Sequence, residues 1–145
     1  MIGRMMIHLL KLSVGSESVE DHADWQTSQR HRWPPGQAVH VTRMFPRREA
    51  DVLESGSLYW VIKGLILCRQ RIVDLVEVTG EDGIARCAIH LDAEVIRTES
   101  APRRPFQGWR YMEPKDAPRD LAHGRHREDP LPEGLALALA EMGVR

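Results

Sequence analysis

A run of closely spaced apolar segments between residues 57 and 98 constrains the fold of this chain more than any other feature. "LYWVI" (58–62) and "LILCRQRIVDLVEV" (65–78) flank Lys63-Gly64, a dipeptide suited to a tight hairpin turn. "TGEDG" (79–83) forms the next turn, before the strands "IARCAIHL" (84–91) and "EVIRT" (94–98). Short turns between long, partly two-sided strands predict a small β-barrel or a strongly curled antiparallel sheet.

The segments before this meander predict one more strand on each side of a helix. "MMIHLLKLSVG" (5–15) is apolar on both faces, as expected of a strand that is covered on both sides. Ser16 or Ser18 can cap a helix that continues to residue 32, where "WPPGQ" (33–37) ends it. "AVHVTRMF" (38–45) alternates like a strand, and Pro46 opens a short helix that Gly56 ends. The predicted class is therefore α+β, with helices flanking the sheet.

The composition changes after residue 112, which divides the chain into three parts. Residues 5–112 are predicted to form a single β-rich domain with an N-terminal helix. Residues 113–132 contain four prolines and many charges, and are predicted to be an extended segment. Residues 133–143 are predicted to form a helix with an apolar stripe, which either docks on the sheet or forms a homodimer contact; the stripe is Leu135, Leu139 and Met142.

Charge and cysteine content limit the classes of protein to consider. The net charge of −1 excludes a globally basic nucleic-acid binder, but 17 of the 20 basic residues are arginine, so a local basic surface remains open. No apolar stretch approaches the roughly 20 residues that a membrane span needs. Cys68 and Cys87 do not make a disulfide framework. We expect a cytoplasmic protein without membrane contact, and the closeness of Met1, Met5 and Met6 leaves the start codon open.

Three separate segments place arginine beside aromatic or polar groups. They are "HVTRMFPRR" (40–48), "RQR" (69–71), whose two arginines share a strand face, and "PRRPFQGWRY" (102–111). If these segments converge, cations would follow a nucleic-acid backbone while rings stack on bases. In the alternative interpretation the rings plug the end of the core and the arginines are solvated. The candidate ligand-binding residues are Arg43, Trp60, Arg69, Arg71, Arg103, Arg104, Trp109, Arg110 and Tyr111.

Signatures of the common enzyme classes are missing from the sequence. It contains no GxxxxGK[ST], GxGxxG, GxSxG or HExxH, and we expect no cofactor. His123 and His126 lie in the charged, proline-rich stretch without nearby cysteines, so we expect no metal site there. The two cysteines are expected to be small buried hydrophobes, and His8 a hydrogen-bonded core residue. An acid–base role stays open for His40 or His90.

Five segments in order resemble a bacterial family of proteins of unknown function, from Met6 to about Leu121. They are "HVTRMFPRR", "GSLYWVIKG", "RQRI", "TGEDGIARCAIHLD" and "PRRPFQGWRY". This resemblance implies no activity.

A more distant resemblance connects residues 50–78 with the EVE and ASCH branches of the PUA-like superfamily. The shared features are a helix, a small turn, a strand ending near a glycine and an "RIVxxxxV" strand. This chain has Gly56-Ser57 where the EVE pattern has Gly-Asp, and it lacks the ASCH motif GxKxxExR. The resemblance implies a PUA-like barrel that holds RNA or a modified base in an aromatic, basic cleft, with Trp60, Arg69, Arg71 and Trp109 as the positions to test.

Three functional hypotheses follow from the sequence. The leading one is a module that binds single-stranded nucleic acid, RNA or a modified base. The second is a small enzyme or binder for a phosphorylated or carboxylated metabolite, with arginine holding the anion and His40 or His90 acting as acid–base. The third is an interaction protein that dimerises through the stripe of residues 133–143.

Overall fold

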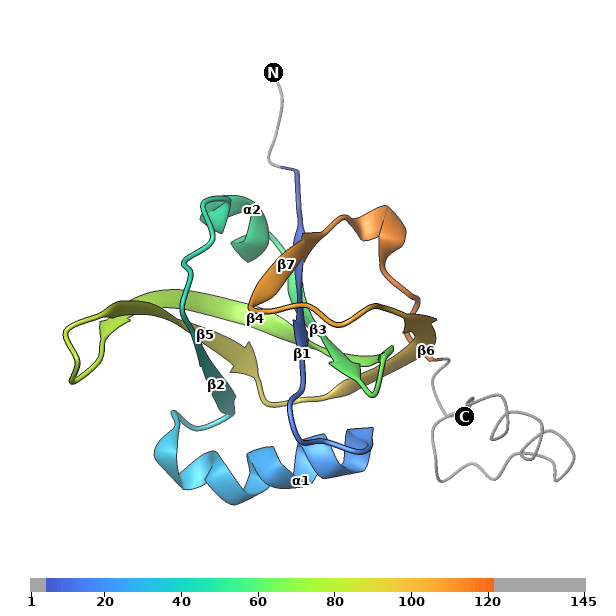
Figure 1. Cartoon of the computed structure of the whole chain (residues 1–145), viewed down its shortest axis with the longest axis horizontal. Helices are drawn as coiled ribbons and strands as arrows, with labels where there is room; N and C mark the ends of the chain where they lie inside the picture. The colour runs from blue at the N-terminus through green and yellow to red at the C-terminus, as the bar shows by residue number, and fades with distance from the viewer. Residues whose placement is uncertain (1–4, 122–145) are drawn as a thin grey trace, which may run out of the picture.

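The computed structural model describes residues 5–121 as a mixed α+β fold, with a seven-stranded sheet and few helices (Figure 1). The helix α1 lies across one end of the sheet and the short helix α2 lies at the opposite end (Figure 1). In chain order the elements are β1 (His8–Leu12), α1 (Val19–Gln29), the 3₁₀ turn η1 (Arg30–Arg32), β2 (Gln37–Thr42), α2 (Glu49–Leu53), β3 (Ser57–Ile62), β4 (Leu65–Thr79), β5 (Ala85–Asp92), β6 (Ile96–Pro102), β7 (Trp109–Met112) and the 3₁₀ turn η2 (Pro114–Asp116).

The long strand β4 organises the sheet. One edge of β4 pairs with β6 along Leu65–Arg69 and then with β5 along Ile72–Thr79. The other edge pairs with β3, so that the strand order is β2-β5-β4-β3-β1-β7, with β6 beside β4. The meander predicted from the sequence is confirmed for β3, β4 and β5, whereas the expected strand β6 forms but pairs with β4 and not with β5.

The sheet is curled but it does not close into a barrel, so the predicted barrel is corrected to an open sheet whose strand order ends in β2 and β7. Nor is the sheet purely antiparallel, because β1 and β3 run parallel. Curling brings β2 opposite β3, since the ring of His40 lies 5.3 Å from that of Trp60. Side chains of β7 bridge the remaining gap to the segment after β2, where Trp109 Nε1 donates to the Met44 carbonyl (2.7 Å) and the Arg48 N–H donates to the Tyr111 hydroxyl (3.0 Å).

Apolar side chains cover both faces of the sheet, as the two-sided pattern of residues 5–15 predicts. Leu9 of β1 belongs to the inner cluster with Leu58 and Ile89, while the adjacent Leu10 belongs to an outer cluster with Tyr59. Successive residues of a strand point to opposite faces, so a strand with apolar residues at both parities is covered on both sides.

Local turn and cap chemistry explains several element boundaries. Lys63 and Gly64 have positive φ angles of 52° and 84°, the geometry of the expected tight hairpin between β3 and β4. The Ser18 hydroxyl accepts from the Asp21 N–H (3.0 Å) and caps α1. Gly56 follows α2, and a side chain there would collide with the carbonyl oxygens of Ile7 and Val52.

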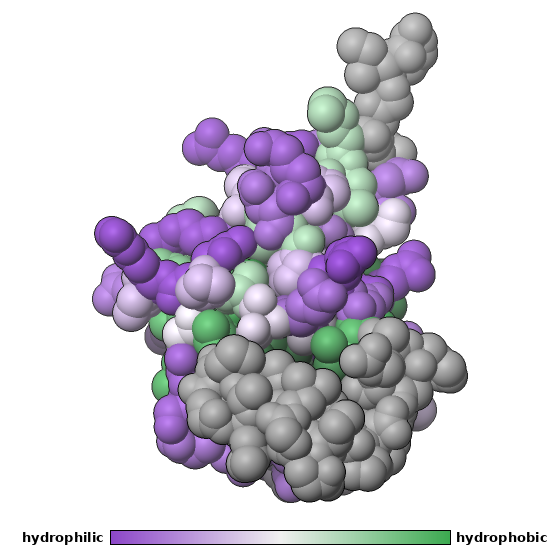
Figure 2. Space-filling view, turned by 90° about the vertical axis from the view of Figure 1, so that its right-hand side faces the viewer, coloured by the Kyte–Doolittle hydropathy of each residue, from purple (hydrophilic) through white to green (hydrophobic). Residues whose placement is uncertain are grey.

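The segment after β7 returns to the sheet. Residues Thr98 and Asp120 form an isolated antiparallel bridge, and the Leu121 N–H donates to the Arg97 carbonyl (3.0 Å). The predicted helix 133–143 and the pair His123 and His126 lie outside the described residues. On the face that carries β6, hydrophilic side chains cover most of the described surface and hydrophobic residues form small patches between them (Figure 2). Within residues 5–121 no helix is both long and apolar enough to span a membrane.

Candidate functional site: a pocket under the first helix

A pocket of about 560 Å³ lies where the sheet is left open, between β1, β2 and α1. Strand β7 pairs with β1 only as far as Lys11, so Leu12 and the loop of residues 13–16 have no strand on that side. Residues from α1, the end of β1, its following loop, β2 and β3 line the pocket. Its volume is in the range of small-molecule sites.

Two tryptophans give the pocket an aromatic lining. Trp60 of β3 is 3% exposed and its ring lies 4.6 Å from that of His22. Trp25 of α1 is 56% exposed, and its ring lies 6.0 Å from the ring of Trp33. The pocket therefore has a fixed aromatic wall and a second, solvent-exposed indole.

Lys11 lies among apolar and aromatic neighbours on the inner face of the sheet. It is the direct cross-strand partner of both Trp60 and Trp109, and it follows the core residues Ile7 and Leu9 on the same face. Burial lowers the pKa of its amine. No hydrogen bond or ion pair joins this amine to another residue within the described chain.

A buried amide pair holds the wall of the pocket in place. Gln70 of β4 is fully buried; its Oε1 accepts from Trp60 Nε1 (2.8 Å), and its Nε2 donates to the Asp92 carbonyl (3.1 Å). Gln26 of α1 forms reciprocal bonds with Gln70, of 2.9 Å and 2.8 Å. This network attaches α1 to the sheet and fixes the position of the Trp60 ring.

His22 extends the network from Gln26 into the loop after β1. Its Nε2 lies 3.2 Å from Gln26 Nε2, and its Nδ1 lies 2.8 Å from the hydroxyl of Ser13. The Ser13 hydroxyl is in turn 2.8 Å from that of Ser16. Burial lowers the pKa of His22, so the ring is neutral at neutral pH.

His40 carries the single buried side-chain nitrogen or oxygen without a partner within residues 5–121. This atom is Nε2, and the residue also lines the pocket. Burial, with smaller effects of Lys11 and His22, lowers the pKa of His40 to about 4. A neutral imidazole therefore faces the pocket at physiological pH.

The structure places the candidate residues on both faces of the sheet, where the sequence left their convergence open. Trp60 and Gln70 point to the inner face of the sheet, whereas Arg69 and Arg71 point to the outer face. Arg69 forms a two-pronged pair with Asp120, with both N–O distances 2.8 Å, and also donates to the Ser57 hydroxyl (2.8 Å). Arg71 is exposed. Of the nine candidates, only Trp60 lines the described pocket.

In the segment "PRRPFQGWRY" the aromatic side chains pack against the protein, whereas the arginines are exposed or half-buried. Trp109 is buried and Tyr111 half-buried, and both attach the segment after β2 to β7. Arg110 lies over the ring of Phe106, 5.2 Å from its centre, on the outer face, and Arg103 donates to the carbonyls of Pro102 and Asp116. Arg43 and Arg104 are exposed. Ligand binding by these residues stays a prediction.

Among the histidines and cysteines of residues 5–121, His22 and His40 line the pocket and the others do not. His8 accepts from the Ser57 N–H (3.0 Å), as expected of a satisfied core histidine. His90 lies on the opposite face of the β2–β5 pair from His40 and contacts Gln37 (2.9 Å). Cys68 and Cys87 are free and buried, and burial raises their pKa values to about 12 and 11. Among residues 5–121 no three His, Cys, Asp or Glu side chains are grouped to hold a metal.

Sequence reasoning missed most of the pocket: Lys11, Ser13, Ser16, His22, Trp25 and Gln26. One signal was available for Lys11, because it takes an inward position in an apolar strand whose other inward residues are Ile7 and Leu9. Gln70 carries the same signal between Cys68 and Ile72. Polar residues at core positions often mark a site or a buried network.

The fold and the pocket together define an α+β protein with an open, curled sheet and a ligand-sized site under its first helix. The chain belongs to a family described as proteins of unknown function (DUF1489), which it matches over residues 9–145. No curated protein and no solved structure matches the chain. The resemblance to a family of proteins of unknown function is thus confirmed, and the description assigns no activity.

Proposed function

We propose that this protein binds nucleic acid and that one unstacked base of a single strand enters the pocket under α1. The observation that carries the proposal is the pocket itself, about 560 Å³ in volume and lined by Trp60 and Trp25. Proteins that read single strands stack bases on aromatic rings, and a pocket of this size can take one planar base.

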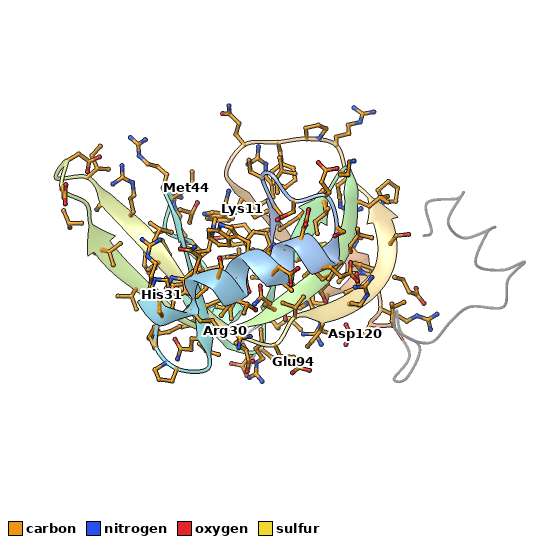
Figure 3. All side chains as sticks on the ribbon, turned by 90° about the horizontal axis from the view of Figure 1, so that it is seen from below. Lys11, Arg30, His31, Met44, Glu94 and Asp120 are labelled. Carbon is orange, nitrogen blue, oxygen red and sulfur yellow. The ribbon has the colours of Figure 1, made fainter. Side chains whose placement is uncertain are left out.

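The surface next to the pocket supplies cations for the strand. Arg30, His31 and Arg32 follow α1 in η1 and are exposed, and Figure 3 shows Arg30 and His31 at this end of the helix. Trp25, one turn earlier, is exposed as well and lines the pocket. A base inserted beside Trp25 would leave its neighbouring phosphates within reach of these side chains.

The resemblance to the PUA-like superfamily supports the same proposal. We propose a distant relationship, in which the open sheet of this chain corresponds to the barrel of that superfamily. Its members hold RNA or a modified base in an aromatic cleft, and Trp60 is the residue common to that expectation and to the pocket.

The test is binding of short single-stranded RNA and DNA, measured by quenching of tryptophan fluorescence and by anisotropy at low and near-physiological salt. Trp25→Ala should weaken binding about 5- to 100-fold, as expected for the loss of one stacked base. Arg30→Ala with Arg32→Ala should lower the slope of log K against log salt by about 1.4, because each phosphate contact contributes about 0.7 with single strands.

The matched control is Arg71→Ala with Arg104→Ala, two exposed arginines outside the pocket lining that the sequence also nominated. This variant should bind like the unmodified protein. If it loses as much affinity as the Arg30/Arg32 variant while Trp25→Ala is unaffected, the strand binds at the arginines nominated from the sequence instead. Absence of saturable binding to any strand at both salt concentrations would contradict the proposal.

A second candidate is a binder or small enzyme for a phosphorylated or carboxylated metabolite. The unpaired amine of Lys11 in the pocket favours it, because a half-buried cation without a partner is suited to hold an anion. Saturable binding of a small anion without any response to strands would favour this candidate. The dimerisation hypothesis rests on residues 133–143, outside the described chain.

A further inference from the structure

The pocket is lined by the amine of Lys11 and by the hydroxyl pair of Ser13 and Ser16, which can donate hydrogen bonds to a ligand. We propose that Lys11 and the hydroxyl pair of Ser13 and Ser16 hold a phosphate group of the ligand, so that the pocket recognises a nucleotide rather than a bare base. This inference rests on the proposed function, because the base of the same nucleotide would lie against Trp60 and Trp25.

Lys11 is the cation of this phosphate site. Its side chain starts from the inner face of β1, between Trp60 of the neighbouring strand β3 and Trp109 of the neighbouring strand β7. Figure 3 shows Lys11 beside α1. Within the described residues it has neither a hydrogen bond nor an ion pair. A half-buried ammonium loses hydration without gaining a partner, and an oxyanion in the pocket would supply one.

The buried amide network fixes which way its hydrogen bonds run. Trp60 Nε1 can only donate and the Asp92 carbonyl can only accept, so the amide of Gln70 has one allowed orientation. Gln70 in turn orients Gln26, whose Nε2 faces Gln70 Oε1 (2.9 Å). His22 Nε2 lies 3.2 Å from this Gln26 nitrogen and 3.4 Å from Gln70 Oε1. Because Gln70 Oε1 already accepts two shorter bonds, we assign the shorter contact, in which Gln26 Nε2 donates to His22 Nε2.

This direction leaves one hydroxyl hydrogen for a ligand. With Nε2 of His22 accepting, the neutral ring carries its proton on Nδ1 and donates it to the Ser13 hydroxyl oxygen (2.8 Å). The two hydroxyls of Ser13 and Ser16 hold two hydrogens and share one bond between them, at 2.8 Å. Whichever serine donates to the other, one O–H remains, and both residues line the pocket.

The other titratable groups that line the pocket do not supply an anion to Lys11. His22 and His40 are neutral at neutral pH, because burial lowers both pKa values. Asp21, on the first turn of α1, is the one carboxylate of the lining; its Oδ2 accepts from the Glu17 N–H (3.0 Å), and it forms no ion pair with Lys11. An ammonium and a hydroxyl hydrogen remain for an external oxyanion.

The test compares the four common ribonucleosides, their 5′-monophosphates, a single-stranded RNA hexamer and inorganic phosphate as ligands in titration calorimetry. With the unmodified protein at least one monophosphate should bind about tenfold or more tighter than its nucleoside, as charge-assisted bonds predict. Lys11→Met should reduce that ratio to near one, whereas Lys11→Arg should keep part of it. Ser13→Ala with Ser16→Ala should lower it by a smaller factor.

Lys115→Met is the matched control, because Lys115 is exposed and lies outside the pocket lining. It should leave every affinity unchanged, and a thermal unfolding curve for each variant shows whether the fold is retained. If Lys11→Met weakens binding of the hexamer alone, the phosphate held by the pocket belongs to a strand. If Lys11→Met weakens binding of the monophosphates, that phosphate belongs to a free nucleotide.

Equal affinity for nucleosides and monophosphates, with no effect of Lys11→Met on the hexamer, would overturn the phosphate site and leave the base pocket standing. Binding of none of these ligands would overturn both proposals. Binding of inorganic phosphate that survives Lys11→Met would place the anion elsewhere and also overturn the inference.

Discussion

Gln70 shows how a single side chain joins the core to the candidate site. It takes an inward position of β4 between Cys68 and Ile72, where the sequence pattern calls for an apolar residue. Its amide bonds Trp60, Gln26 and the Asp92 carbonyl. A fully buried amide is tolerated only because both of its ends have partners, and these partners are the residues that support the pocket wall.

We therefore expect Gln70→Met to destabilise the protein and to loosen Trp60. The substitution keeps a side chain of similar length but leaves the Trp60 N–H and the Asp92 carbonyl without partners. Each unsatisfied buried group costs about 1–3 kcal/mol. Urea unfolding should report the loss and near-UV circular dichroism the change at Trp60, with the exposed Gln107→Met as control. A variant as stable as the unmodified protein would contradict this account of the network.

Strand β7 shows at the scale of elements what holds an open sheet in shape. β7 pairs with β1 through its backbone, and its two aromatic side chains attach to the segment after β2. The rings of "PRRPFQGWRY" thus take the place of strand pairing between the two ends of the sheet. This role agrees with the interpretation that they plug the end of the core.

Trp109→Phe should release the segment after β2 from β7. Phenylalanine keeps most of the ring packing but cannot donate to the Met44 carbonyl, which leaves that acceptor without its partner. We expect a loss of about 1–3 kcal/mol in the free energy of unfolding and faster amide hydrogen exchange at residues 44–48.

Phe106→Leu provides the comparison, because Phe106 packs on the outer cluster. It should lower stability without changing exchange at residues 44–48. Equal exchange in the two variants would mean that the Trp109 bond does not hold that segment.

The sequence predicted those elements whose signals are local. The hairpin at Lys63-Gly64 and the Ser18 cap follow from the residues at the turn or helix end themselves. β7 was missed because its four residues pair with β1, from the other end of the described chain, and no local period encodes such a register. Trp60 was named as a candidate through the resemblance to the PUA-like superfamily, and it lines the pocket.

The assembly of the pocket could not be read from the sequence for the same reason. Lys11, His22 and His40 come from three elements, and their convergence depends on the curl of the sheet and on the docking of α1. Strand alternation sends Arg69 and Trp60 to opposite faces, so these two candidates do not share a cleft; ligand binding by the arginine segments stays a prediction. The period of two along the strand predicts that Arg69 and Arg71 share one face of the sheet. It does not predict which face of the sheet lies over the pocket.

At the scale of the whole molecule, buried neutral histidines make folding depend on pH. Burial, together with the charge of Arg69, lowers the pKa of His8 to about 4. His40 is lowered to about 4 as well, by burial and then by Lys11 and His22, while burial lowers His22 itself. All three side chains pack against the faces of one sheet. Protonation of these histidines in the folded state therefore opposes folding of the whole domain.

Whether acid stabilises or destabilises the protein depends on the pH at which the folded and the unfolded state take up protons. The unfolded chain protonates its histidines near pH 6.5, whereas folded His8 and His40 stay neutral down to about pH 4. Between these values the unfolded state binds more protons, so stability is fully present above pH 6.5 and falls as the pH drops toward 4. Each histidine contributes a slope of at most about 1.4 kcal/mol per pH unit.

Urea unfolding between pH 7.5 and 4.5 should therefore give a free energy that is flat above pH 7 and declines steadily below pH 6.5. His8→Gln and His40→Gln should each reduce the slope of that decline, even though His8→Gln loses its bond from the Ser57 N–H and starts from a lower stability. Carboxylates contribute at lower pH, since Arg86 lowers the pKa of Asp82 to about 2. A free energy of unfolding that does not change from pH 7.5 to 4.5 would show that these histidines take up protons over the same pH range in the folded and unfolded states, and would contradict the lowered pKa values.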